Sequence, residues 1–300
     1  MLPVYNDWDS FRILLEDLGK EFSTCRIVVI DDGSSQHPGS ISSALPIDII
    51  KLTQNLGHQK AIAIGLSYVA EKYPASSILI MDADGNDTVA DAVKLQHLSH
   101  QNPDKIILAK RKKRNESLFF KIIYQLYLCT FRLLTGKSIR YGNFCLLPNL
   151  YAQKIVHLSN IWLHLPAAIV KSGFPNKELD TIKGERLRGK SKMNVTSFLF
   201  HGLGAIAVFT DIIAIRLLIT SIVSILISVA ALATIIFIKF STDLAIPGWA
   251  SAVGSSLIII ILLSFLISIL LIFIFIISQS SRKFIPAIHY KDYLQSSQTN

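Results

Sequence analysis

Short apolar runs recur through the first 110 residues, and each of them ends in polar residues. The runs are Arg26–Ile30, Ile47–Leu52, Ile78–Met81 and Lys105–Ala109. Between them lie stretches with apolar residues three and four positions apart or rich in small residues, at Phe11–Leu18, Ala61–Tyr73 and Ala90–His100. Strands that alternate with helices in this way predict an α/β fold built on a parallel sheet.

The pattern changes after residue 211, where two long runs are almost free of charge. Leu217–Ile238 carries no charged residue over 22 positions, and Leu244–Ser281 is also uncharged, with its most apolar part at Leu257–Ile277. Each run exceeds the ~20 residues that a spanning helix needs. Because neither run has a polar face, a pair of buried core helices is a poor explanation, and we predict two transmembrane helices.

Composition and charge narrow the class of protein. The hydrophobic fraction is 51%, the mean hydropathy is +0.44, and the net charge is +9, from 30 Lys and Arg against 21 Asp and Glu. No zinc-ligand spacing or aromatic–basic interleaving supports nucleic-acid binding, so the positive charge is expected to face anionic lipid and an anionic substrate. Cys25, Cys129 and Cys145 form no paired motif and are expected to be reduced thiols. The residues after Met1 do not resemble a signal peptide.

The positions of the charges predict the topology. The link Lys239–Val253 contains one Lys and one Asp, whereas the tail after Ser281 holds Arg282, Lys283 and Lys291. The positive-inside rule therefore places the large amino-terminal part and the tail in the cytoplasm. The expected divisions are a large amino-terminal domain at 1–195, an interfacial amphipathic segment at 196–211, spans at 212–238 and 254–278, and a basic tail at 279–300.

The stretch with the clearest chemistry is the end of the Ile78–Met81 run. Asp82 and Asp84 follow that run directly, on either side of Ala83. Ligands of parallel sheets collect at the carboxyl ends of the strands, and two neighbouring carboxylates repel each other unless a cation or a proton lies between them. The stretch alone is compatible with a metal site and with a capped strand end in an Asp-Gly turn.

Basic and amphipathic segments complete the pattern. Lys110–Arg114 is compatible with a solvated loop, a nuclear-type basic patch, a phosphate clamp or a contact with lipid head groups. Phe119–Leu134 predicts an amphipathic helix lying on a membrane or on the sheet. Tyr141–Leu147 predicts a further strand, Lys183–Met193 a flexible basic loop, and Thr196–Thr210 an interfacial helix.

The order of motifs resembles family 2 glycosyltransferases of the GT-A fold, and within them the membrane-anchored branch of dolichol-phosphate mannose synthase and the bacterial polyprenyl-phosphate glycosyltransferases. The motifs are Pro3-Val4-Tyr5-Asn6-Asp7, Asp31-Asp32-Gly33-Ser34, Asn55-x-Gly57, Asp82-Ala83-Asp84, the basic loop after Ala109, Arg188-Gly189-Lys190-Ser191-Lys192, and the two spans. The resemblance implies a Rossmann-like nucleotide-sugar-binding domain followed by two transmembrane helices. No Gln-x-x-Arg-Trp sequence occurs, which speaks against the processive synthases of this superfamily.

The resemblance also implies roles for individual residues. Nucleotide-sugar binding would fall to Pro3, Val4, Tyr5, Asn6, Asp32, Gly57, Lys60 and Asp82. A Mg²⁺ or Mn²⁺ ion would be held by Asp82, Asp84 and Asn86 and would help the nucleoside diphosphate to leave. Catalytic roles would fall to Asp84, Asp87, Arg111, Arg188, Ser191 and Lys192.

Two departures from the family pattern bear on the reaction. Only Met1-Leu2 precede Pro-Val-Tyr where relatives have a longer strand, so either the start is late or the first strand is missing. Asn143 stands where many relatives carry an Asp that is a candidate base. An ionised acceptor phosphate needs no base, whereas a hydroxyl acceptor would need one, such as Asp87.

The expected function is transfer of a sugar from a UDP- or GDP-linked donor to a polyprenyl phosphate at the cytoplasmic face, by a non-processive, inverting enzyme. Two alternatives remain open: transfer to another lipid or a glycan hydroxyl, and a non-catalytic membrane adaptor with a degenerate domain. The expected partners are the nucleotide sugar, the lipid phosphate and membrane lipids, with a homo-oligomer considered and no nucleic acid.

Overall fold

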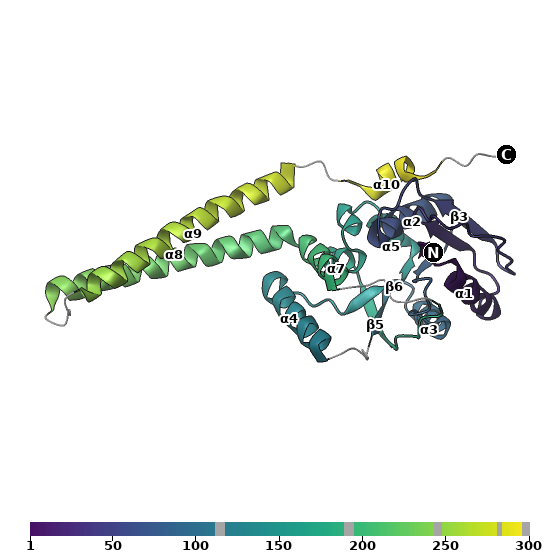
Figure 1. Ribbon diagram of the computed structural model, residues 1–300, viewed down its shortest axis with the longest axis horizontal. Helices are drawn as coiled ribbons and strands as arrows, with labels where there is room; N and C mark the ends of the chain where they lie inside the picture. The colour runs from purple at the N-terminus through teal and green to yellow at the C-terminus, as the bar shows by residue number, and fades with distance from the viewer. Residues whose placement is uncertain (112–117, 189–194, 243–247, 281–283, 296–300) are drawn as a thin grey trace. The chain divides into compact units, whose positions relative to one another are not determined.

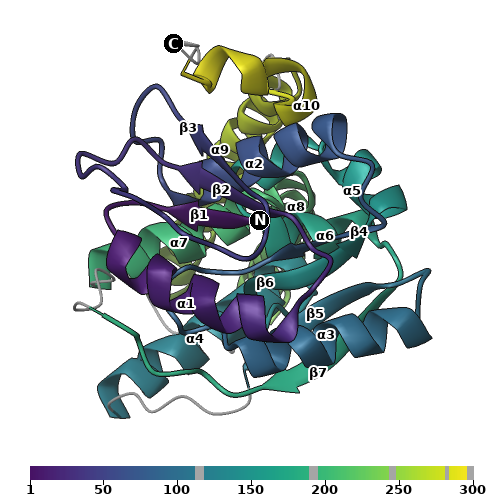
Figure 2. The ribbon, with the colours of Figure 1, turned by 90° about the vertical axis from the view of Figure 1, so that its right-hand side faces the viewer.

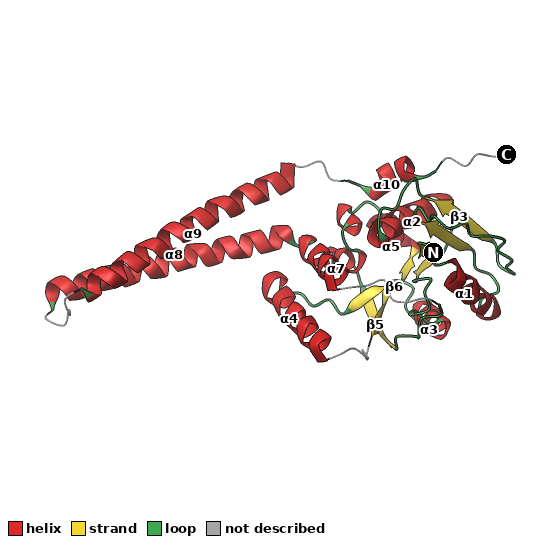
Figure 3. Cartoon of the chain, viewed as in Figure 1, coloured by secondary structure: helices red, strands yellow, loops and turns green. Residues whose placement is uncertain are grey.

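The computed structural model describes residues 1–111, 118–188, 195–242, 248–280 and 284–295. The chain divides into two compact units, which we call the sheet unit and the hairpin unit. The sheet unit comprises Met1–Phe131, Lys137–Val208 and Lys283–Asn300, and the hairpin unit comprises Arg132–Gly136 and Phe209–Arg282. Figure 1 follows the chain by colour, and Figure 3 separates helices from strands.

The first sheet of the sheet unit contains three parallel strands in the order β1-β2-β3. They are β1 (Leu2–Val4), β2 (Ile27–Asp31) and β3 (Ile47–Lys51). The short β1 pairs with β2 from Leu2 opposite Val29 to Val4 opposite Asp31. A first strand is therefore present, although it has only three residues.

The second sheet contains four strands in the order β4-β6-β5-β7. They are β4 (Ser77–Ile80), β6 (Tyr141–Pro148), β5 (Ile106–Arg111) and β7 (Asn176–Thr181). Strand β6 runs antiparallel to both β4 and β5, whereas β5 and β7 are parallel. The expectation of a parallel sheet holds for β1 to β3 and is wrong for this sheet, because β6 enters between β4 and β5 from the opposite end.

Helices cover the strands on two sides because successive side chains of a strand point to opposite faces. Val28 and Ile30 of β2 belong to one core with α2 (His58–Lys72), while Val29 belongs to a second core with α1 (Trp8–Glu21). In Figure 2, α1 and α3 (Val89–Gln101) lie on one side of the strands, and α2 lies on the other. The remaining elements of this part of the chain are α4 (Leu118–Thr135), α5 (Asn149–Ile155), η1 (Ser159–Trp162), α6 (Leu165–Ser172) and α7 (Val195–Ala207).

The tail returns to the sheet unit as α10 (Pro286–His289) and η2 (Tyr290–Tyr293). The Tyr290 ring is buried, and its hydroxyl donates to Glu71 Oε2 of α2 at 2.7 Å. Leu294 forms an antiparallel bridge with Leu52, directly after β3. The tail thus belongs to the core of the domain.

The hairpin unit consists mainly of α8 (Thr210–Ser241) and α9 (Trp249–Ser280), each of 32 residues. At ~1.5 Å per residue both exceed the ~30 Å of a bilayer core. Ser221 Oγ lies 2.7 Å from Ser268 Oγ and also contacts the carbonyl of Ser264, so polar contacts join the two helices. Both are long and apolar enough to be candidate membrane spans.

Candidate active site

The candidate site lies where β1, β2 and β4 end, at the carboxyl edge of the strands. The Asp32 carboxylate is buried and accepts from the amides of Leu56 (2.8 Å) and Gly57 (3.0 Å). The Asp32 amide in turn donates to Val4 O at 2.8 Å. Burial raises the pKa of Asp32, although the two amide donors oppose this shift. The ends of β1 and β2 and the start of α2 therefore meet at one carboxylate.

Gly33 allows the two turns of this region to approach each other. Its φ is +69°, and a Cβ built there would lie 2.6 Å from the Asn55 backbone nitrogen. Only glycine combines that conformation with that contact. Asn6, at φ +50°, accepts the Gln36 amide on its side-chain oxygen and donates its own amide to Ser34 Oγ. The polar loops after β1 and β2 are thereby joined.

The Asp-x-Asp turn after β4 is closed by its own side chains. Asp84 Oδ1 accepts the Asn86 amide at 3.0 Å, and Asp84 Oδ2 accepts from the Asn86 side chain. Gly85 between them has φ +88°. Burial raises the pKa of Asp84 against the effect of its amide donor. Asp84 and Asn86 are therefore adjacent in space as well as in sequence.

The Asp87 carboxylate joins the Asp-x-Asp turn to Arg111 at the end of β5. Its side chain is 2% exposed, and its Oδ2 accepts the Asp82 amide at 2.9 Å while its Oδ1 accepts from Arg111 Nη2 at 3.0 Å. Burial, and next the charge of Asp82, raise the pKa of Asp87 to about 7, although Arg111 opposes the shift. Both carboxylate oxygens of Asp87 are engaged within the protein.

Asp82 faces a group that sequence reasoning missed, His58 at the start of α2. His58 Nε2 lies 3.2 Å from Asp82 Oδ1, and the Asn143 amide nitrogen lies 2.9 Å from the same ring nitrogen. This contact is an ion pair only when the His58 ring is protonated, and Asp82 Oδ1 is buried and accepts no hydrogen bond from the described residues. Desolvation opposes charge on the ring, but the nearby carboxylates, Asp82 foremost, raise the pKa of His58.

Residues 184–188 dock on the Asp-x-Asp turn. Arg186 Nη1 donates to Asp84 Oδ2 at 2.9 Å, and its Nη2 donates to Asp7 Oδ2. The Gly184 amide donates to Asn86 O at 2.9 Å, and the Leu187 amide donates to Asp84 O at 3.0 Å. This segment and the turn therefore form one hydrogen-bonded structure.

The structure brings some of the residues expected from the sequence into contact. Gly57 donates to Asp32, Asp82 and Arg111 both donate to Asp87, and Asn86 donates to Asp84. Pro3 and Val4 are buried in β1, and Tyr5 is exposed beyond it.

Other expected residues lie apart from these contacts. Lys60 Nζ lies 5.3 Å from the centre of the Trp162 ring. Arg188 is exposed and offers its carbonyl to Arg186 Nε and Ser10 Oγ. Ser191, Lys192 and the basic run at 112–114 lie outside the described residues.

Sequence reasoning passed over Asp7, His58 and Arg186. Asp7 closes the Pro-Val-Tyr-Asn-Asp motif, and His58 follows the Asn-x-Gly motif directly. Arg186 lies two residues before the arginine that was expected to act. Each residue lies in a recognised motif or within two residues of one. The sequence alone does not show which residue near a motif faces a carboxylate.

A divalent cation suits the donor atoms at this edge of the strands. The described residues contain no group of three or more His, Cys, Asp or Glu that could hold a metal by themselves. Mg²⁺ and Mn²⁺ bound with a nucleotide take only one or two carboxylates, and substrate phosphates and water supply the other oxygens. Asp84, the Asn86 amide oxygen and Asp82 Oδ1, which accepts no hydrogen bond from the described residues, fit such a shared ion.

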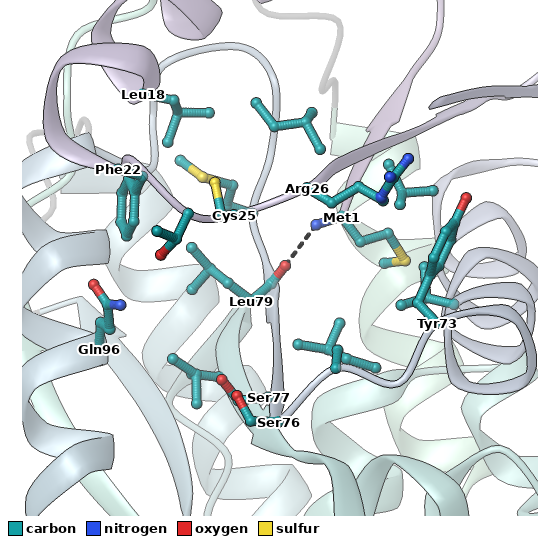
Figure 4. Close-up of a pocket in the computed structure, with 18 of the residues that line it drawn as sticks. Met1, Leu18, Phe22, Cys25, Arg26, Tyr73, Ser76, Ser77, Leu79 and Gln96 are labelled. Carbon is teal, nitrogen blue, oxygen red and sulfur yellow. Dashed lines mark hydrogen bonds between the residues drawn. The ribbon is translucent and has the colours of Figure 1, made fainter. Parts of the chain in front are cut away.

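A cavity of about 680 Å³ lies at the opposite edge of the strands (Figure 4). Its lining includes Met1 before β1, Arg26 before β2, Tyr73 after α2, and Ser77 and Leu79 of β4. The Met1 ammonium group donates to Leu79 O at 2.7 Å, and burial lowers its pKa to about 5. None of the carboxylates described above lines this cavity, so it is separate from the candidate site.

Comparison with known proteins places these features in context. The family model described as "Glycosyl transferase family 2" matches residues 1–152. The chain is 24% identical over 270 residues to the uncharacterized glycosyltransferase YkcC of Bacillus subtilis (strain 168), covering 84% of this chain and 80% of that protein.

The chain also aligns with solved structures. A glucosyl-3-phosphoglycerate synthase from Mycobacterium tuberculosis, solved with Mn²⁺, UDP-glucose and phosphoglyceric acid, aligns with a TM-score of 0.50 and 10% identity over 71% of this chain and 78% of that chain. The S. aureus TarS fragment 1–349, solved with UDP-GlcNAc, aligns with a TM-score of 0.43 and 17% identity over 72% of this chain and 65% of that chain.

Proposed function

Because the chain belongs to glycosyl transferase family 2, we propose that it transfers a sugar from a nucleoside-diphosphate donor to a lipid phosphate at the cytoplasmic face of a membrane. The observation that carries this proposal is the position of His58, which follows the Gly57 that donates to Asp32 and lies 3.2 Å from Asp82 Oδ1, so that the carboxyl ends of β2 and β4 come together. Nucleotide ligands of open α/β sheets bind at the carboxyl ends of the strands.

The donor would lie along the loops after β1, β2 and β4. The exposed Tyr5 and the buried Asp32 would face the base and ribose, and Asp82 Oδ1, which accepts no hydrogen bond from the described residues, would face a ribose hydroxyl or the cation. The M. tuberculosis synthase was solved with UDP-glucose and Mn²⁺, which supports a UDP-linked donor and a divalent cation.

Asp84, with Asp82 and Asn86, would hold Mg²⁺ or Mn²⁺. When bound, such an ion offsets the negative charge that develops on the departing nucleoside diphosphate. The chain's own contribution is to keep the Asp84 carboxylate in place, which the Asn86 amide does through its hydrogen bond to Oδ1. Asp87 acts through other groups, because it fixes the Asp82 backbone and orients Arg111.

The described contacts favour an acceptor that needs no general base. Asp87 uses both oxygens within the protein, and Asn143 cannot take up a proton and already accepts from Gln59 Nε2 at 2.9 Å. A phosphate oxygen is ionised at neutral pH and can attack the sugar carbon without losing a proton. Arg111 supplies positive charge beside two anionic substrates, which Coulomb repulsion would otherwise keep apart.

Membrane attachment accounts for the choice of a lipid. The chain carries two helices long and apolar enough to cross a bilayer, and α4 exposes Ile122, Leu126 and Leu133. A lipid acceptor is confined to the bilayer, so an anchored enzyme meets it at high local concentration.

The test is a transfer assay in membranes that contain the full chain. Radiolabelled UDP- and GDP-sugars are supplied with undecaprenyl phosphate or with undecaprenol, which offers a hydroxyl in place of the phosphate. Label is expected in the phosphate lipid only. Transfer to the alcohol would favour the hydroxyl-acceptor alternative, and no transfer with any donor would favour the adaptor.

A further inference from the structure

Arg186 occupies an unusual position for a surface-loop arginine. Its side chain is only 18% exposed, and its guanidinium group bridges two carboxylates, Asp84 (17% exposed) and Asp7 (20% exposed). Its Nε donates as well, to Arg188 O at 2.9 Å. All three guanidinium nitrogens are therefore engaged.

One of these carboxylates is the one that the proposed function assigns to a cation. Asp84 Oδ2 receives Arg186 Nη1 at 2.9 Å and the Asn86 amide group. A carboxylate oxygen that accepts two hydrogen bonds from N–H donors has little lone-pair density left for a metal. The guanidinium group and a divalent cation would thus compete for the same carboxylate and satisfy the same negative charge.

We propose, on the basis of the function given above, that Arg186 is an internal counter-cation that competes with the divalent cation for Asp84. When the ion binds, Arg186 leaves Asp84 and its charge becomes free for the diphosphate that the ion brings with it. Arginine suits both partners, because its planar group pairs with carboxylates and with phosphates in the same bidentate manner.

The main-chain hydrogen bonds of residues 184–188 extend the effect of this exchange beyond the Arg186 side chain. Gly184 and Leu187 donate to the carbonyls of Asn86 and Asp84, and the Leu187 side chain packs against Gly85, where an added Cβ would lie 2.5 Å from Leu187 Cγ. A change at Asp84 is therefore transmitted to residues 184–188 through main-chain contacts. Arg186 couples the charge state of the turn to the position of this segment.

The direct test measures Mn²⁺ binding to the purified full chain without nucleotide, from the electron paramagnetic resonance signal of free Mn²⁺. Removing a competitor whose charge-assisted hydrogen bonds contribute about a tenfold factor should let Arg186→Met bind Mn²⁺ about tenfold more tightly than the wild type. Lys183→Met is the matched control. It removes the same charge from an exposed position directly before residues 184–188, and its affinity should stay within about twofold of the wild type.

Two further measurements separate competition from a general charge effect. With UDP present, Arg186→Met should bind the Mn²⁺–UDP pair more weakly than the wild type, so the effect of the substitution changes sign. Asp7→Asn removes one anchor of Arg186 and should raise the Mn²⁺ affinity by a smaller factor. Circular dichroism and the melting temperature of each variant confirm that it is folded.

The proposal is overturned if Arg186→Met binds Mn²⁺ no more tightly than the wild type, or if Lys183→Met shows the same gain. A fall in Mn²⁺ affinity in Asp7→Asn would make Asp7 a ligand and would also overturn it. None of these results depends on sugar transfer, so failure of the proposed function would appear separately, as absence of product with every donor and acceptor.

Discussion

Arg111 and Asp87 form an ion pair at the candidate site, and the Asp87 carboxylate is fully buried. Two assignments of the chemistry differ at this pair. If the acceptor is a phosphate, Arg111 is the important partner, because its charge draws in the second anion. If the acceptor is a hydroxyl, Asp87 is the important partner, because it takes the proton.

Substitution distinguishes these assignments. Arg111→Ala should lower kcat by about 10²- to 10³-fold, the usual effect of removing a charge that stabilises a transition state. Asp87→Asn should lower it only about tenfold, since the amide oxygen can still accept from the Asp82 amide. Initial rates in membranes measure both, and Asp17→Asn, in an exposed ion pair with Lys20, is the matched control. An inactive Asp87→Asn beside a nearly normal Arg111→Ala would mean that the acceptor is a hydroxyl.

Asp84 is the residue that ties activity to a divalent cation. Asp84→Asn keeps the size of the side chain and removes its charge, so transfer should be lost while the melting temperature changes little. EDTA should abolish wild-type transfer, and Mg²⁺ or Mn²⁺ should restore it. Full activity in the presence of EDTA would contradict the role of the cation.

His164 lies outside the site and predicts a pH dependence of stability. It is buried at the start of α6, its Nδ1 accepts the Ala167 amide at 3.1 Å, and its Nε2 lies 3.1 Å from His201 Nε2. Burial, and next the neighbouring His201, lower the pKa of His164 to about 3. In the unfolded chain the same ring titrates near 6.5. The folded state therefore fails to bind a proton that the unfolded state binds.

The free energy of unfolding should consequently fall as the pH drops below about 6.5, by up to ~1.4 kcal/mol per pH unit, until the folded pKa is reached. His164→Asn keeps an acceptor for the Ala167 amide and removes the titration, so its loss of stability between pH 7 and 5 should be smaller. Melting of the detergent-solubilised chain at several pH values measures this. Equal slopes for variant and wild type would show that His164 does not titrate as proposed.

At the scale of elements, the tail α10–η2 contributes to the core of the sheet unit. Tyr290 is 1% exposed, packs against Tyr68 with ring centres 6.2 Å apart, and donates to Glu71. Lys291 pairs with the same glutamate at 2.7 Å, but its side chain is 60% exposed. The two neighbours therefore differ in burial and share a partner.

Tyr290→Ala should reduce the free energy of unfolding by about 3 kcal/mol, the typical cost of removing a large buried aromatic ring. Lys291→Ala should cost less than about 1 kcal/mol, because exposed ion pairs contribute little. Chemical unfolding followed by tryptophan fluorescence compares them. Similar losses in the two variants would mean that the tail is not packed as described.

At the scale of the whole molecule, the chain leaves the sheet unit after Val208 and re-enters it at Lys283. If α8 and α9 both span the bilayer, the tail must lie on the same side as the catalytic domain. The basic residues on both sides of the hairpin favour the cytoplasm for both.

Reporter fusions test this topology. A reporter after the last residue should report the cytoplasm, and one inserted in the segment 243–247 between α8 and α9 should report the opposite side. A carboxyl-terminal reporter on the outer side would contradict the two-span arrangement.

The sequence alone determined the features that depend on neighbouring residues. Runs without charge over 22 positions are apolar whatever they pack against, so the two long helices could be predicted from composition. A buried strand followed by carboxylates is equally local, which is why β2, β4, Asp32, Asp82 and Asp84 were found. The family match and the observed fold confirm the GT-A domain.

Only the tertiary structure decided how distant residues meet. The direction of β6 depends on which end of the strand reaches β4 and β5, and an apolar run carries no sign of direction. Arg186 and Arg188 are the same residue type two positions apart, and only the docking of residues 184–188 on the Asp-x-Asp turn brings the first, and not the second, onto Asp84. Arg186 contacts a carboxylate 102 positions away in the sequence because the fold places the two side chains next to each other. Sequence spacing does not determine this proximity.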